Sequence, residues 1–329
     1  MKHNLSKTKR SGFVVVVVLC MVILMSVLLL GFNRGALVCL RAADDAGKTT
    51  QTLNCARAGL NIAIAAVRDT PDIYANRNLA NLLSGKGTFD VGGGNCSVTV
   101  TEEDGKLNLN LLKNKDGTLN QTRIDQLLRL IDLLNQEQTG RLRIDYGLVP
   151  AIIDWTDSDD QVTCLPFIKN QNLGAESAHY DTLTPPYKCK NAPLDATEEL
   201  LLVKGVTPDV FALIHDYVTV YGSGEININC APKHIIESLS EKMDPALAQL
   251  IIDRRKIKPF ETITELQDVS GMTDGVYNAI KKAATVRSTA QYYQVVSRGN
   301  AGQLGSTIVA LLRRDTEIKT IEVVSYKEI

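Results

Sequence analysis

The chain has 329 residues, a formal net charge of −1 and a pI of about 6.4. This balance excludes a general electrostatic attraction to nucleic acid, and the length is sufficient for two folded domains. The chain has only four histidines and no Cys-x-x-Cys, which argues against a zinc site.

The first element is an uncharged stretch, residues 13–32, which follows a short basic leader. At about 1.5 Å per residue, a helix of this length can cross the roughly 30 Å hydrocarbon core of a membrane. The basic leader predicts that the N-terminus stays in the cytoplasm. We therefore expect a single-pass membrane protein with the bulk of the chain on the far side of the membrane from the cytoplasm.

Residues 1–12 end in Ser11-Gly12, directly before the apolar run. Cleavage between Gly12 and Phe13 would leave the membrane helix in the mature protein, an arrangement that resembles the type IV pilin and pseudopilin class and implies processing by prepilin peptidase. An uncut signal anchor is the alternative. The fifth residue after the cut is Val17, where most pilins have a glutamate. A subunit at a filament tip has no neighbour above it whose amine needs that acid, so Val17 favours a tip position.

Apolar residues continue at helical spacing beyond the span, which predicts one N-terminal helix over 13–70, ending near Asp69-Thr70-Pro71. Alternation at Val98 and Val100 then predicts a strand. We expect Glu103-Asp-Gly105 to form a hairpin turn and residues 107–111 to form the returning strand or an extended segment.

Helical spacing resumes at Arg123 and dominates to about Ala284, and three strand-like runs follow in the last 40 residues. Since strands that flank an insertion usually pair, we predict one α/β domain built from 71–111 and 288–329. A large all-helical domain, 112–287, is inserted between its strands. The fold class is therefore α+β.

An acidic loop follows the sequence Ile152-Ile-Asp-Trp155. Its oxygen ligands suit calcium, and the predicted ligands are Asp157, Asp159, Asp160 and Glu176. The alternative is a solvated acidic turn with helix caps, and Asp154 beside Trp155 would then be a structural carboxylate. Six cysteines follow the span and allow 15 pairings, among which Cys164 and Cys189 flank one loop-rich stretch and are our first candidate disulfide.

The helical block resembles the helix-hairpin-helix (SAM-like) repeats of competence-type DNA receptors, but in degenerate form. Two turns, at Gly205-Val-Thr207 and Gly271-Met-Thr273, keep one glycine of the phosphate-binding Gly-apolar-Gly pattern, and the third, at 241–244, has none. Residues 195–285 hold 14 acidic and 9 basic side chains, a net charge of −5. A phosphate-binding module should be basic, so we predict no nucleic-acid partner.

Several short motifs occur in a specific order over nearly the whole chain: Asn108-x-Asn110, Asp154-Trp155-x-Asp157-x-Asp159, Gly174-Ala-Glu176-x-x-x-Tyr180, and Glu198-Glu-Leu200 through Gly205. With the N-terminal span and the degenerate repeats, this order resembles the general secretion pathway protein K family, the minor pseudopilins of type II secretion.

The resemblance implies a non-enzymatic subunit with a pilin-like α/β domain, at the tip of a periplasmic pseudopilus. It implies that the subunit starts or caps pseudopilus assembly and supports secretion across the outer membrane. The implied partners are other minor pseudopilins, the major pseudopilin, prepilin peptidase and the inner-membrane assembly platform. Calcium-binding members occur in the family, which supports the calcium prediction for the acidic loop.

Two other classes remain as alternatives: a membrane-anchored DNA receptor of the competence type and a minor pilin of a type IV pilus. Catalysis has little support. The chain has no Gly-x-Ser-x-Gly, no phosphate-binding Gly-x-x-x-x-Gly-Lys and no His-Glu-x-x-His, so we expect no enzyme.

Overall fold

A computed structural model describes residues 10–69, 84–138, 140, 142–168, 172–287, 290–315 and 320–329. It opens with one continuous helix, α1 (Arg10–Asp69). The N-terminal part of α1 is exposed and highly apolar, and within the described residues it is the single helix long and apolar enough to cross a membrane. The predicted helix over 13–70 is thus present, and its end at Asp69 agrees with the predicted stop.

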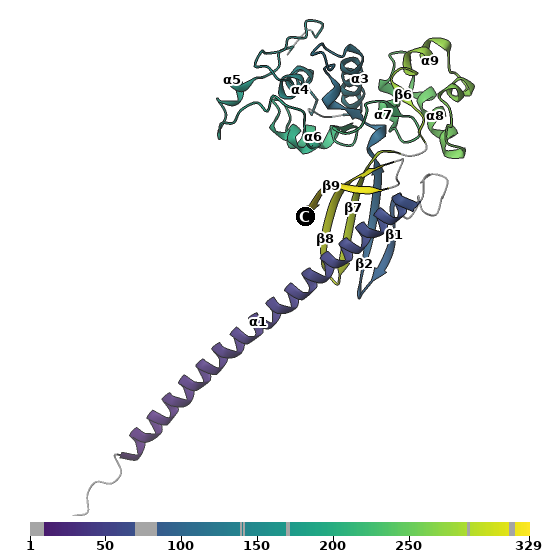
Figure 1. The fold of residues 1–329 in the computed structure, drawn as a ribbon. Helices are drawn as coiled ribbons and strands as arrows, with labels where there is room; N and C mark the ends of the chain where they lie inside the picture. Colours follow the sequence, from purple (N-terminus) through teal and green to yellow (C-terminus); the bar gives the residue numbers. More distant parts are fainter. Residues whose placement is uncertain are drawn as a thin grey trace, which may run out of the picture.

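A five-stranded antiparallel sheet forms the centre of the molecule, in the order β1-β2-β7-β8-β9 (Figure 1). Its strands are β1 (Ser84–Val91), β2 (Gly94–Glu102), β7 (Tyr292–Ala301), β8 (Leu304–Arg314) and β9 (Ile321–Glu328). Strands β2 and β7 are neighbours although 189 residues lie between them in the sequence. The predicted pairing across an insertion is therefore confirmed.

The C-terminal half of α1 covers one face of this sheet. Its buried residues recur at helical spacing and pack on side chains from alternate strand positions, as expected for a helix on a pleated sheet. The helix contributes Ala56, Leu60, Ala63 and Val67, and the sheet contributes Val98, Tyr293, Val295, Ile308, Ala310 and Leu312.

The predicted hairpin at 103–105 is wrong. The turn that leads into β2 lies earlier, at Gly92 and Gly93, whose φ angles of +50° and +88° suit the two central positions of a tight hairpin turn. Residues Glu103–Gly105 form a 3₁₀ turn, η1, instead. The Asp104 carboxylate accepts the backbone N–H groups of Gln291 and Tyr292, at 3.0 and 3.3 Å, and so ties the two connections to the inserted block together.

The expected returning strand over 107–111 is also wrong, because this segment belongs to the inserted block. Strand β3 (Leu107–Asn108) pairs in parallel with β4 (Val218–Thr219). Leu107 and Leu109 lie fully buried in the core of that block.

The inserted block is mostly helical and lies beyond the end of the sheet, away from the apolar end of α1 (Figure 1). A second parallel strand pair, β5 (Ile226–Asn227) with β6 (Ala284–Thr285), closes it. One hydrophobic cluster runs through it, from Leu107 to Ala284. Its helices are α3 (Gln121–Glu137), α4 (Leu148–Thr156), α5 (Ser177–Tyr180), α6 (Pro208–Ile214), α7 (Lys233–Ser238), α8 (Pro245–Ile257) and α9 (Asp274–Ile280), with 3₁₀ turns η2 (Leu109–Leu111), η3 (Thr197–Leu202) and η4 (Ile263–Asp268).

Candidate metal centre

Three buried carboxylates meet where α4 ends. Asp154 lies in the last turn of α4, and Asp157 follows directly as its C-cap, with its N–H bonded to Ile153 O at 3.0 Å. Glu176 precedes α5 and arrives on the returning side of the loop. One oxygen from each of the three carboxylates lies within 4.8 Å of one from each of the others.

Several of these oxygens lack protein partners. Asp154 Oδ1 accepts the Thr163 N–H at 2.8 Å. Within the described part of the chain, Asp154 Oδ2 and both Glu176 oxygens form no hydrogen bond of normal geometry, although both residues are at most 2% exposed. The nearest groups that could donate are the Ala175 N–H beside Asp154 and the Cys189 thiol beside Glu176. Buried carboxylates without donors are costly unless a cation compensates them. The donor set is all oxygen, which suits calcium rather than zinc.

One side-chain cation already reaches the cluster. Lys113 Nζ lies 2.8 Å from Asp157 Oδ2 and 3.9 Å from Asp159 Oδ2. Among the described residues, Lys113 is the one cation that forms an ion pair with these three buried carboxylates, so the acids outnumber their ion-pair partner. Burial, followed by the nearby charges of Asp154 and Asp157, raises the pKa of Glu176 to about 7. Burial also raises the pKa of Asp154.

A glycine makes room for this cluster. A Cβ atom at Gly174 would lie 2.1 Å from Asp154 Oδ2 and 2.6 Å from Pro150 O. Both contacts are too short for any side chain, so the loop can pass over the end of α4 only with glycine at this position. The Gly174 N–H bonds to Thr163 O at 3.0 Å and fixes the two sides of the loop together.

The structure therefore brings together Asp157 and Glu176 from the predicted set, but not the other two. The Asp159 side chain is 50% exposed, and its Oδ1 accepts the Gln161 N–H. Asp160 Oδ1 accepts the Ser177 N–H at 3.3 Å. Sequence reasoning treated Asp154 as structural and did not consider Lys113. The i, i+3 spacing of Asp154 and Asp157 at a helix end was the available signal for the first.

The candidate disulfide is not formed in the structure. Both thiols are free, Cys164 exposed and Cys189 buried. The Cys189 thiol lies 3.5 Å from Asp154 O, behind the carboxylates, and burial raises its pKa to about 12. Trp155, which follows Asp154 in α4, packs edge-on against Tyr180, with ring centroids 5.1 Å apart. One side of the acidic cluster is thus walled by apolar groups.

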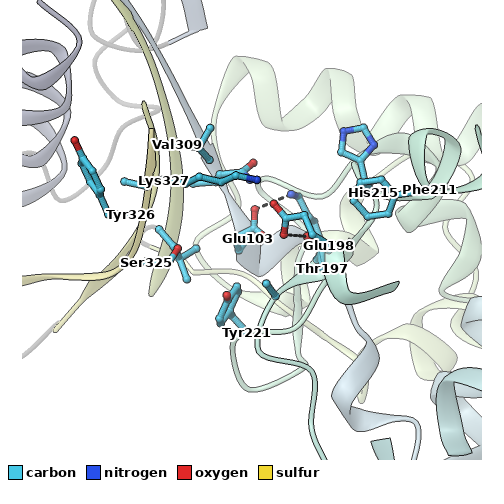
Figure 2. A pocket seen from close by; sticks show the side chains of 15 residues that line it. Glu103, Thr197, Glu198, Phe211, His215, Tyr221, Val309, Ser325, Tyr326 and Lys327 are labelled. Carbon is cyan, nitrogen blue, oxygen red and sulfur yellow. Dashed lines mark hydrogen bonds and ion pairs between the residues drawn. The ribbon is translucent and has the colours of Figure 1, made fainter. Parts of the chain in front are cut away.

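A separate groove of about 360 Å³ runs between the inserted block and the face of the sheet that α1 leaves open (Figure 2). Glu103 and Lys106, an ion pair at 2.6 Å, line it from the connection, and Glu198 and Phe211 line it from the block. Lys327 of β9 lines the opposite side. No oxygen cluster comparable to that at Asp154 occurs among these lining residues.

The turns that resemble DNA-binding hairpins are capped by the chain itself. Gly205 and Gly271 both have φ near +86°, and each leads to a threonine N-cap. Thr207 accepts the N–H of Val210, and Thr273 that of Val276. At α8, the Asp244 carboxylate takes two N–H groups. These N-termini thus have donors already engaged where a phosphate would bind. The identity of these turns as degenerate repeats stays a prediction.

The predicted processing junction lies on the first turns of α1. Phe13 is 73% exposed, and no atom lies within 4 Å of a Cβ built at Gly12. Residues 1–9 of the leader lie outside the described residues. Cleavage at this junction stays a prediction.

The sequence comparisons with known proteins all indicate the same family. Two sequence models, both described as type II secretion system (T2SS), protein K, match residues 105–223 and 226–287, which together are more than half of the chain. Type II secretion system protein K of Aeromonas hydrophila is 32% identical over 107 residues, 32% of this chain and 28% of that protein. The putative type II secretion system protein K of Escherichia coli K12 is 33% identical over 90 residues, 26% of this chain and 25% of that protein. The matched segments thus span only about a quarter of these relatives.

The fold has a solved counterpart. A chain in the crystal structure of the GspK-GspI-GspJ complex from the enterotoxigenic Escherichia coli type 2 secretion system superposes with a TM-score of 0.66 at 17% identity. The superposition covers 88% of this chain and 99% of that one. The likeness therefore extends to the sheet and to the inserted block.

Proposed function

The chain belongs to the type II secretion system protein K family, and we propose that it is a minor pseudopilin at the tip of the secretion pseudopilus. In this role α1 anchors it in the inner membrane by a single pass before assembly, and the sheet and inserted block lie in the periplasm. The role is structural rather than enzymatic. The subunit starts or caps the filament and thereby supports protein secretion across the outer membrane.

The position of the inserted block is the observation that supports a tip location. The block lies beyond the sheet, at the end opposite the apolar part of α1 (Figure 1). Subunits in a filament of this type stack along their N-terminal helices, so another globular domain above this one would meet the block. Head-to-tail contacts otherwise continue without limit, and a subunit that obstructs its own upper face ends the series. The apolar Val17 agrees with a subunit that has no neighbour above it.

A solved structure that shares the fold is a complex with GspI and GspJ. By analogy we propose that this chain binds two other minor pseudopilins, together with the major pseudopilin below them. Prepilin peptidase and the inner-membrane assembly platform would act on it earlier.

Calcium is a second part of the proposal. Asp154, Asp157 and Glu176 would hold the ion, and the buried oxygens of Asp154 and Glu176 that form no hydrogen bond of normal geometry support the fit. Bound calcium would supply the positive charge that the buried acids lack. The chain's own residues then do the rest: Gly174 admits the Asp154 carboxylate, and the Thr163 N–H orients it.

A shortened chain tests the tip role. Glu102 and Tyr293 are register partners on β2 and β7, so a short turn can replace the inserted block and join the two strands as a hairpin. The shortened protein should enter the pseudopilus shaft, because the obstruction is gone. Val17→Glu in the full chain is the matched control and should leave the protein at the tip. Exclusion of the folded, shortened protein from the shaft would contradict the steric argument.

A further inference from the structure

Two buried cysteines lie on opposite sides of the contact between α1 and the sheet. Cys55 lies on the sheet-facing side of α1 and is 2% exposed, and Cys96 lies in β2 and is fully buried. Both are free thiols in the structure. A buried cysteine on its own is usually a small apolar residue, so the argument depends on how close the two lie.

The helix backbone touches the sheet at this point. Gly299 of β7 is the register partner of Cys96. A Cβ built at Gly299 would lie 2.9 Å from Cys55 Cβ, 2.1 Å from Thr52 O and 2.4 Å from Ala56 N. The axes or mean planes of packed layers usually lie about 8–10 Å apart, and a disulfide requires two Cα atoms within about 7 Å of each other. Here a glycine allows an approach close enough for one.

The positions of the sulfur atoms also indicate that the two cysteines lie close together. A Cβ built at Gly59, one helical turn after Cys55, would lie 3.1 Å from Cys96 Sγ. A Cβ built at Gly94, two residues before Cys96 on the same face of β2, would lie 2.8 Å from Cys55 Sγ. Each sulfur thus lies over a position adjacent to the other cysteine.

A bond requires the Cys55 sulfur to turn from its present position. The Cys55 thiol now donates to Val91 O at 3.4 Å, and rotation about its Cα–Cβ bond redirects the sulfur along β2 toward Cys96. Cross-strand partners such as Cys96 and Gly299 have Cβ positions about 4.5–5.5 Å apart. Because Cys55 Cβ lies beside the Gly299 position, the two cysteines are near the Cβ separation that disulfides require.

We propose that Cys55 and Cys96 form a disulfide that fixes α1 to the sheet. The two thiols lose two electrons and two protons to a disulfide-bearing oxidant, such as oxidised glutathione or a thiol-oxidising protein. The products are the Cys55–Cys96 sulfur–sulfur bond and two reduced thiols on the oxidant. Because both residues are covered in the folded state, oxidation precedes or accompanies the docking of α1.

The disulfide is not part of the proposed role. It rests on that role only because the role places the residues after the span in an oxidising compartment. It would close a loop of about 40 residues and hold the helix and sheet as one unit while the apolar half of α1 leaves the membrane. Cys20 and Cys39, by contrast, are exposed on the distal part of α1.

The test is peptide mapping of the full chain, purified in detergent from membranes without reductant and alkylated in denaturant. We expect one linked pair of peptides, containing Cys55 and Cys96, and a melting temperature that falls by roughly 5 °C or more after reduction. Cys55→Ala should free the Cys96 thiol and abolish the reduction-dependent shift. Cys164→Ala, at an exposed thiol, should leave the link unchanged.

A second experiment tests whether the fold itself permits the disulfide, independently of the cell compartment. The full chain is reduced and unfolded, then refolded into detergent in a glutathione redox buffer. Formation of the link there supports the inference whatever compartment the cell uses, and its absence from cells alone would then contradict the periplasmic placement. Refolded protein in which both Cys55 and Cys96 are alkylated without reduction would overturn the inference.

Discussion

The buried acid Glu176 predicts how the stability of the metal-free protein depends on pH. Its pKa rises from 4.5 in the unfolded chain to about 7 in the folded chain. Between these values the folded state binds the proton more tightly, so folding takes up a proton. The stability from this group is complete below pH 4.5 and is lost as the pH rises through 7. Since Glu176 is 2% exposed, the shift corresponds to about 3 kcal/mol.

The single tryptophan provides the assay. Trp155 is buried beside Asp154 and reports unfolding of the inserted block through its fluorescence. Urea unfolding of the full chain in detergent and chelator should show stability that declines from pH 5 to pH 8. Glu176→Gln should remove most of this decline, because the amide does not titrate. Calcium at pH 8 should restore stability to the wild-type protein and not to the variant.

The matched control is Glu198→Gln, on the groove of the inserted block and outside the acidic cluster, which should keep the wild-type pH dependence. A wild-type stability in chelator that is flat or rises from pH 5 to pH 8 would refute the reasoning for Glu176. A rise with pH would mean that the carboxylates are stabilised as anions by the protein itself.

Other perturbations test separate parts of the account. Lys113→Met should raise the calcium affinity roughly tenfold, measured by isothermal titration, because the ammonium group 2.8 Å from Asp157 competes with the ion. The control Lys115→Met should leave the affinity unchanged, and equal affinities for Lys113→Met and the wild type would exclude the competition. Gly174→Ala should destabilise the block by about 1–3 kcal/mol and abolish the calcium response, since its Cβ would lie 2.1 Å from Asp154 Oδ2; wild-type urea unfolding would show that the loop has room. N-terminal sequencing of membrane-extracted protein should begin at Phe13, and an intact Met1 in cells with active prepilin peptidase would leave a plain signal anchor.

Much of the fold follows from local patterns. The apolar run and the continued helical spacing predicted α1 to within one residue of its end, because a long helix repeats its signal many times. The three C-terminal strands were also predicted, from three runs of strand-forming residues of which the first two are punctuated by glycines. Strand β1 was missed, since Ser84–Val91 contains two glycines and little alternation. Because β1 was not recognised, the segment after the turn signal at 103–105 was the nearest candidate partner for β2. The hairpin turn is instead at Gly92–Gly93, on the other side of β2.

The acidic site was only partly predictable for a different reason. Asp157, Asp159 and Asp160 are equally acidic residues of one loop, so the sequence does not distinguish them. Which side chain turns inward depends on where α4 ends and on backbone donors such as the Ser177 N–H. Lys113 lies 44 residues from Asp157 in the sequence, and no local pattern connects them. The closeness of Cys55 and Cys96 likewise depends on Gly299, which comes from a strand beyond the insertion.

The central claim is that this subunit ends a filament. Immunogold labelling of sheared pseudopili, with antibody against the inserted block, tests it most directly. The account predicts label at one end of each wild-type filament. Label spread evenly along the filaments would contradict it.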